Sequence, residues 1–339
     1  MEINIEVNKK NKELVFKLLS QLIDAEDTEG RMKEKSLEGA LDVDLFKKQG
    51  QKYVSGQNSR KMQDYSVDYS QFLKYTKPLP VGFLHKPKIT QSAVGTWFMF
   101  NSFLVGKALL RVLSAMLLQR TEPNEANPAT VSVTDLLETS YSAFKTANLL
   151  GYRGFPKEKE GHKYAGSNVK KLRYFVIAPL EEMGFVTIEN INDEEFVGMT
   201  RYGDELNILK NPILEGLETQ HDRYLSDEEI DYLLNYLKKI DSEGYKEYSL
   251  LKDFYAYLRD GNRTHTDLEN WFKANTKIIN YLYKGSRSEQ SGKDTDSKEF
   301  KEQLKHAAAA FVSGKVALLR ELKLITNERG KYNTVREFV

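Results

Sequence analysis

The chain of 339 residues contains no cysteine, and this absence excludes several kinds of chemistry. Without thiols there is no disulfide, no thiolate metal site and no cysteine nucleophile. A chain without disulfides suits a reducing compartment, so we predict a cytoplasmic protein. The chain also has almost no excess of positive or negative charge, because 50 Lys and Arg residues nearly balance 49 Asp and Glu residues. Any affinity for nucleic acid must therefore come from local basic surfaces.

Catalytic signatures are scarce. The five histidines are scattered, and the sequence has no HExxH motif, no glycine-rich phosphate loop and no Gly-x-Ser-x-Gly motif. We therefore predict no catalytic residue, no metal site and no cofactor. One short pattern, Arg259 to His265, resembles the Arg-x(4–6)-His signature of HEPN-type ribonucleases. That resemblance implies His265 as general acid or base and Arg259 as stabiliser of the phosphorane, although Gly261 and Asn262 favour a loop.

Long apolar runs are absent with one exception, residues 94–118. This stretch is long enough to be tested as a membrane span, but it contains Asn101, Ser102, Lys107 and Arg111. Each central Lys or Arg costs about 2.5–3.5 kcal/mol on the insertion scale. We therefore predict a buried helix and no membrane partner.

The most informative stretch is residues 161–206. Ser167 or Asn168 can cap a helix whose apolar residues recur at helical spacing as far as Met183. Gly184 then ends the helix. Pro179 lies inside it and predicts a kink, because proline removes one backbone hydrogen bond.

Two short strands, residues 185–188 and 196–200, follow the glycine and flank a polar tip at 190–195. This helix, turn and hairpin resemble the winged helix-turn-helix superfamily of DNA-binding proteins. The resemblance implies that residues 96–119 form the first helix of the module and residues 136–150 the middle helix. It also implies that the helix before the hairpin contacts nucleic acid.

Charge indicates which part of this region would face DNA. Residues 153–174 contain seven Lys or Arg and two Glu, whereas residues 185–206 contain six acidic residues and one Arg. A basic surface gains affinity because each neutralised phosphate releases a counterion, and an acidic hairpin tip would be repelled. The predicted DNA-binding residues of this region are Lys163, Ser167, Asn168, Lys170, Lys171, Arg173 and Tyr174.

The second half of the chain has helical patterns and ends in another hairpin. Residues 226–229 resemble a capping box, and the Ser-Gly-rich residues 285–297 predict a mobile loop. A helix over residues 298–322 precedes a segment that looks like a second recognition helix, turn and wing. Its tip carries Arg329 and Lys331, which we predict to bind DNA.

These patterns predict a mainly α fold with small β-hairpins, an α+β class with tandem winged-helix modules joined by a helical region. The predicted divisions are an N-terminal helical and extended region (1–90), a central winged-helix module (91–210), a helical region (211–290) and a C-terminal winged-helix-like module (291–339).

The leading hypothesis is a DNA-binding protein, such as a regulator or a component of a mobile-element, replication or defence system, with double-stranded DNA as its partner. Two alternatives stay open: a protein-interaction subunit with winged-helix ends, and a nuclease of the HEPN or restriction type. A homodimer or another protein partner also stays open. Salt dependence separates the first hypothesis from the second, because phosphate binding weakens steeply with salt.

Overall fold

The structure, a computed structural model, describes residues 68–338 with gaps at 75, 93–94, 97–99, 120–127, 153, 157–171, 217–223, 260, 262, 276–277 and 279–297. The chain divides into two compact parts, residues 1–67 with 118–121 and residues 68–117 with 122–339. All elements below belong to the second part. The predicted N-terminal region is therefore described only from residue 68, and the predicted loop at 285–297 lies outside the described residues.

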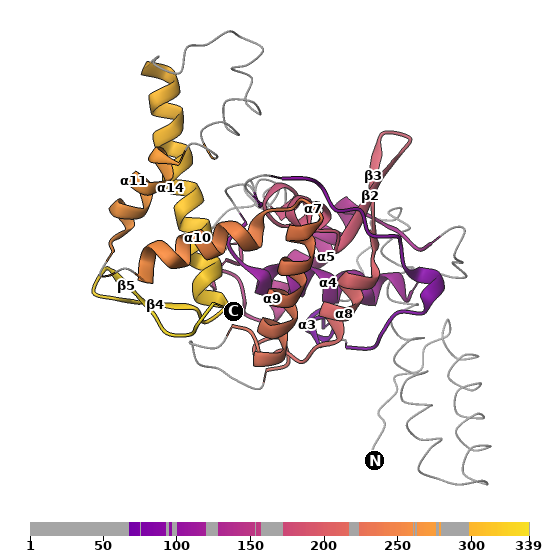
Figure 1. Cartoon of the computed structure of the whole chain (residues 1–339). Helices are drawn as coiled ribbons and strands as arrows, with labels where there is room; N and C mark the ends of the chain where they lie inside the picture. Colours follow the sequence, from indigo (N-terminus) through magenta and orange to yellow (C-terminus); the bar gives the residue numbers. More distant parts are fainter. Residues whose placement is uncertain are drawn as a thin grey trace, which may run out of the picture. The chain divides into compact units, whose positions relative to one another are not determined.

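The described part of the chain is mainly helical with small antiparallel sheets, which confirms the predicted α+β class. Figure 1 shows how the helices surround α4 (Phe103–Leu117), which is buried along almost its whole length. This confirms the predicted buried helix. Within the described residues, no helix is long and apolar enough to cross a membrane.

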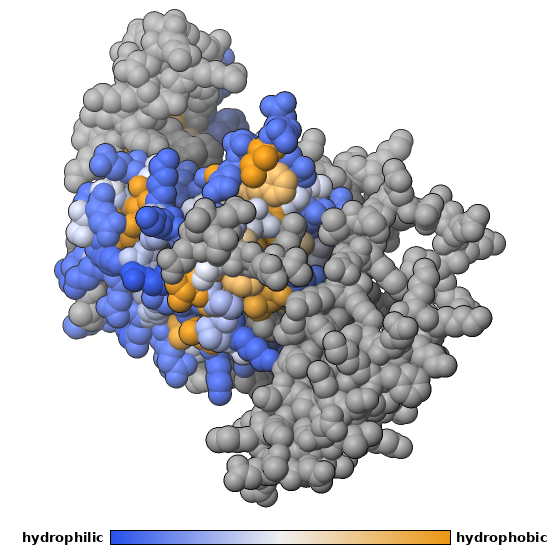
Figure 2. Space-filling model, turned by 90° about the vertical axis from the view of Figure 1, so that its right-hand side faces the viewer, coloured by the Kyte–Doolittle hydropathy of each residue, from blue (hydrophilic) through white to orange (hydrophobic). Residues whose placement is uncertain are grey.

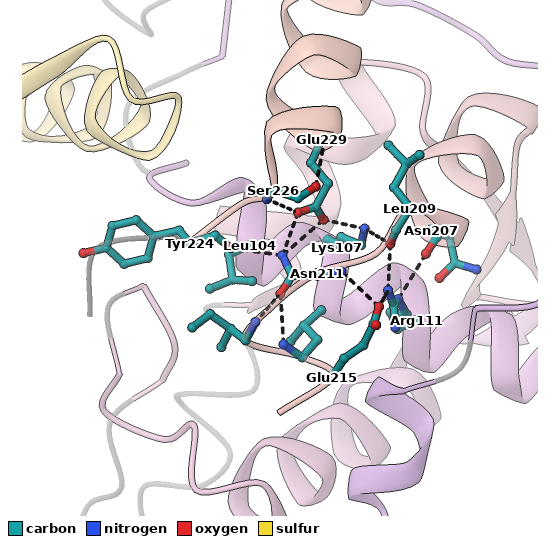
Figure 3. A network of polar contacts seen from close by, with 12 residues as sticks. Leu104, Lys107, Arg111, Asn207, Leu209, Asn211, Glu215, Tyr224, Ser226 and Glu229 are labelled. Carbon is teal, nitrogen blue, oxygen red and sulfur yellow. Dashed lines mark hydrogen bonds and ion pairs between the residues drawn. The ribbon is translucent and has the colours of Figure 1, made fainter. Parts of the chain in front are cut away.

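Two cations of α4 are fully buried, and each has partners that compensate its charge (Figure 3). Lys107 forms an ion pair with Glu229 and donates to the Leu209 carbonyl (2.5 Å). Arg111 donates to the same carbonyl (2.8 Å) and to Glu215 (3.1 Å). Burial lowers the pKa of Lys107 to about 8, while the Glu229 carboxylate acts in the opposite direction. The charges that argue against a membrane span therefore connect α4 to Leu209 and Glu215 and to the first turn of α9 (Asp227–Ser242).

The predicted capping box at the start of α9 is confirmed. The Ser226 side chain accepts from the Glu229 amide (3.2 Å), and the Glu229 carboxylate accepts from the Ser226 amide (2.6 Å). Asn211 also donates to both oxygens of the Glu229 carboxylate, at 3.1 and 2.9 Å. Glu229 thus caps its own helix and neutralises a buried lysine at the same time.

The larger sheet has three strands, β1 (Val131–Ser132), β2 (Val186–Ile191) and β3 (Glu194–Met199), in the order β1-β3-β2. The strands of the hairpin reach closer to its tip than the sequence predicts, because the turn consists of two residues only. Asn192 and Asp193 both have positive φ angles, 52° and 65°. Such a turn matches the twist of the strands, so pairing continues to Ile191 and Glu194.

The helix that leads into this hairpin is described from residue 172. A π-helical segment, η3 (Arg173–Ile177), continues directly into α7 (Ala178–Glu182). This wider π-helical turn lies directly before Pro179, which cannot donate the usual backbone hydrogen bond. Gly184 ends the helix with φ 77°, as predicted.

The remaining elements are mostly helical, and several helix boundaries differ from the prediction. The predicted helix 96–119 is α-helical from Phe103 to Leu117. α5 (Val133–Thr146) ends before residue 150, because Asn148 adopts a left-handed φ of 55°. α11 (His265–Ala274) begins directly after Thr264, which forms a capping box with Asp267. The other described elements are α3 (Ser70–Leu73), η1 (Val81–Phe83), α8 (Arg201–Ile208), α10 (Glu247–Arg259), α14 (Lys298–Glu321), β4 (Ile325–Glu328) and β5 (Lys331–Thr334).

One order of described elements occurs twice. In the central unit, residues 103–199, it is α4, β1, α5, η3 with α7, and the β2–β3 hairpin. In the C-terminal unit, residues 247–338, it is α10, the bridging residue Thr264, α11, α14 and the β4–β5 hairpin. In each unit the short strand or bridge directly precedes the second helix and pairs with the last strand of the hairpin. Helices α10 and α11, which the sequence assigns to region 211–290, thus lie against α14 and its hairpin.

The third helix ends in the same way in both units. After α7 the Phe185 amide donates to the Leu180 carbonyl (2.8 Å), and after α14 the Leu324 amide donates to the Leu319 carbonyl (2.9 Å). The residue before each amide, Gly184 or Lys323, has a positive φ angle. The chain therefore turns from helix to hairpin through one geometry at both places.

Candidate nucleic-acid interface

The β2–β3 hairpin extends away from the helices and ends in an acidic tip (Figure 1). All six residues from 189 to 194 are exposed. Three of them, Glu189, Asp193 and Glu194, are acidic. Because phosphates repel carboxylates, this tip is poorly suited to contact a DNA backbone.

Arg173 is held by the hairpin that follows it. Its guanidinium donates two hydrogen bonds of 2.7 Å to the two carboxylate oxygens of Glu195 on β3. The Glu195 carboxylate raises the pKa of Arg173, and the Arg173 guanidinium lowers the pKa of Glu195. A bidentate pair of this kind neutralises the cation and fixes its direction. Arg173 therefore offers less positive charge to DNA than its position in the sequence suggests.

Tyr174 points into solvent beside this pair. Its side chain is 68% exposed, which is high for a large aromatic residue. Of the two predicted DNA-binding residues of this region that the structure describes, Arg173 and Tyr174, only Tyr174 is free to contact DNA. The other predicted contacts of this region lie outside the described residues: Lys163, Ser167, Asn168, Lys170 and Lys171.

The C-terminal hairpin carries the predicted cations at its tip. Arg329 and Lys331 are both exposed. Arg329 and Gly330 have positive φ angles of 51° and 80°, and Asn327 accepts a hydrogen bond of 3.1 Å from the Gly330 amide. Among the described residues, no ion pair or side-chain hydrogen bond occupies either cation. Both positive charges are thus available to a ligand.

Helix α14, which precedes this hairpin, adds a basic face that sequence reasoning missed. The exposed cations Lys298, Lys305 and Arg320 recur at multiples of about seven residues, and the exposed residues Glu302 and Ser313 lie among them. That spacing places them on one side of a helix, and it could have been found in the sequence. Lys315 lies on the same helix but is 1% exposed, so it is not part of this face.

The histidine of the ribonuclease-like pattern joins α11 to neighbouring elements. His265 Nδ1 lies 3.1 Å from the Tyr332 hydroxyl on β5, and Nε2 lies 3.4 Å from the Ser313 hydroxyl on α14. Arg259 is the last residue of α10. Both ring nitrogens of His265 therefore have protein partners, which favours a structural role for this side chain.

Other kinds of site find little support in the described part of the chain. There, no group of three or more His, Asp or Glu residues could hold a metal ion. Large exposed apolar side chains are few, namely Val81, Tyr174, Ile191, Ile208 and Val335. Where described residues are visible in Figure 2, the surface is mostly hydrophilic with separate apolar patches. The basic surface of α14 and the β4–β5 tip is the strongest candidate interface on these grounds.

Comparison with known proteins identifies no relative: no family model matches the chain, and no curated protein or solved structure is significantly similar to it.

Proposed function

We propose that this chain is a DNA-binding protein whose central and C-terminal units are tandem winged-helix modules. The repeated order of helix, short strand, helix, helix and hairpin supports the fold assignment. The strand order β1-β3-β2, and the bridge from Thr264 to Lys331 on β5, support it further. Because a fold does not determine a function, the assignment of DNA as ligand rests on charge.

The observation that carries the DNA proposal is the exposed basic surface of the C-terminal unit. Arg329 lies in the two-residue turn and Lys331 directly follows it, and α14 presents Lys298, Lys305 and Arg320 along one side. A protein with nearly balanced charge gains affinity for a polyanion only where such cations cluster. In this proposal α14 and the hairpin tip bind the phosphate backbone of double-stranded DNA.

Binding to mixed genomic duplexes, measured by fluorescence anisotropy at several salt concentrations, tests the proposal. Replacing Arg329 and Lys331 with Ala should lower the slope of log affinity against log salt by about 1.8, because two phosphate contacts are lost. Replacing Lys238, an exposed lysine on α9, should leave the slope unchanged. Absence of salt-dependent binding by the parent chain would refute DNA as the ligand, and cleavage in the presence of magnesium would indicate a nuclease.

A second candidate function concerns the central unit alone. Its acidic hairpin tip also exposes Ile191, whose side chain is 46% accessible. Exposed carboxylates around an apolar side chain suit a basic protein partner better than DNA. In this alternative the central unit binds protein while the C-terminal unit binds the duplex, and replacing Ile191 with Ser would weaken the protein contact without changing DNA affinity.

A further inference from the structure

Two ionisable residues of α14 are buried, although this helix is otherwise exposed on one side. Lys315 is 1% exposed and Glu321 is 4% exposed. Lys315 binds Thr96, and Glu321 binds Ser102 and the first two residues of α4, Phe103 and Leu104. A buried charge survives only where partners compensate it, so these two contacts are specific constraints on where α14 can lie.

Glu321 caps a helix of the other unit. Its carboxylate accepts hydrogen bonds from the Ser102 hydroxyl (2.9 Å), the Phe103 amide (2.5 Å) and the Leu104 amide (3.0 Å). The first amides of a helix have no partner within the helix, and a negative charge there also interacts favourably with the helix dipole. The last residue of α14 thus completes the start of α4.

Lys315 holds the segment just before α4. Its ammonium donates to the Thr96 carbonyl (2.8 Å) and forms an ion pair with Glu247, the first residue of α10. The Glu247 carboxylate accepts from the Thr96 amide (2.5 Å). Gly95 permits this close approach, because a Cβ at that position would lie 2.2 Å from a Glu247 carboxylate oxygen. Both backbone groups of Thr96 are therefore bound by charges from the C-terminal unit.

We propose that Lys315 and Glu321 are positioning residues that fix α14 and its hairpin on the central unit. The two units then meet double-stranded DNA in one relative orientation, without an ordering cost at the moment of binding. The DNA part of this inference rests on the proposed function. The fixed orientation of the two units does not rest on it, so an experiment can refute DNA binding and leave the fixed orientation standing, or the reverse.

Distance measurement between spin labels tests the fixed orientation. The chain has no cysteine, so cysteines introduced at Glu138 on α5 and Glu302 on α14, both exposed, would carry the only labels. The parent should give one narrow distance distribution. Glu321→Ala and Lys315→Met should broaden it, while Glu228→Gln, which changes an exposed carboxylate on α9, should not.

DNA affinity provides the second readout. Neither residue can touch DNA, yet Glu321→Ala should weaken binding about tenfold because the orientation is no longer preorganised. The salt slope should stay at the parent value, in contrast to the Arg329 and Lys331 variants, since no phosphate contact is lost. Circular dichroism and thermal melting show that the variant is folded when these values are compared.

The proposal is overturned by a broad distribution in the parent chain, or by an unchanged narrow distribution in folded Glu321→Ala. The parent measurement decides the matter even if both variants fail to fold. If the parent chain binds no DNA, the proposed function fails, whereas the distance distribution still shows whether the two units are rigidly joined.

Discussion

The β2–β3 and β4–β5 hairpins have the same kind of turn and opposite charge. Each turn consists of two residues with positive φ, Asn192 and Asp193 in one hairpin and Arg329 and Gly330 in the other. Around the turn, the first hairpin exposes Glu189, Asp193 and Glu194, whereas the second exposes Arg329 and Lys331 with one carboxylate, Glu328. The comparison teaches that backbone geometry sets the shape of a hairpin, while a few exposed side chains decide what it can bind.

The helices before the two hairpins also differ in how much positive charge they expose. Arg173, before the first hairpin, is neutralised by Glu195. The cations Lys305 and Arg320 on α14 are exposed to solvent. We therefore expect the C-terminal unit to dominate DNA binding, and the predictions below test this difference.

The largest expected effect concerns the anchoring of the second hairpin. Phe338 packs against Tyr248 and Tyr255 of α10, with ring centroids 5.0 and 5.6 Å apart. Phe338→Ala should lower the free energy of unfolding by about 3 kcal/mol, since a buried aromatic residue leaves a cavity. Urea unfolding measures this change. A loss below about 0.5 kcal/mol, as expected for a surface substitution, would show that the tail does not anchor the hairpin.

The second expected effect is that the stability of the fold depends on pH, because Glu321 of α14 is buried against α4. Burial raises the pKa of Glu321 to about 7, above its ordinary value of 4.5. The folded chain therefore holds this proton more tightly than the unfolded chain, and stability falls as pH rises from about 4.5 through 7. The loss should be on the order of 3 kcal/mol and should be absent in Glu321→Gln. Equal pH profiles of urea unfolding for the parent and this variant would contradict the assignment.

The third effect follows from reversing the charge of the second tip. Arg329→Glu combined with Lys331→Glu should reduce DNA affinity about a hundredfold at moderate salt, because two attractions become repulsions. The variant gives the C-terminal hairpin the sign of the central one and so removes the difference between them. Lys238→Glu is the matched control for a change of surface charge. An affinity loss equal to that of the control would place the duplex elsewhere.

The smallest effects are expected at the central tip. Asp193→Asn with Glu194→Gln should leave DNA affinity within about twofold of the parent, because this tip does not face phosphate. Glu195→Gln should raise affinity about threefold if the released Arg173 then reaches a phosphate. Anisotropy titrations at low salt resolve the two cases. A clear gain from the first pair would place the central hairpin on the duplex after all.

Local sequence patterns were sufficient for most helices and for both hairpins. The buried helix α4, the capping box of α9 and the end of α7 at Gly184 follow from spacing and from turn residues that act between near neighbours. The exposure of Arg329 and Lys331 follows from the same reasoning, since a tight turn around Gly330 directs both outward.

Tertiary structure alone decided which charges are free. Arg173 and Glu195 are 22 residues apart, and Glu321 caps α4 across 217 to 219 residues. Periodicity and turn rules describe interactions within a few residues, so neither pairing leaves a signal that one sequence can display. A lysine or glutamate in a helix predicts a solvated surface. In the folded chain Lys315 and Glu321 are instead buried, because distant residues supply partners for their charges.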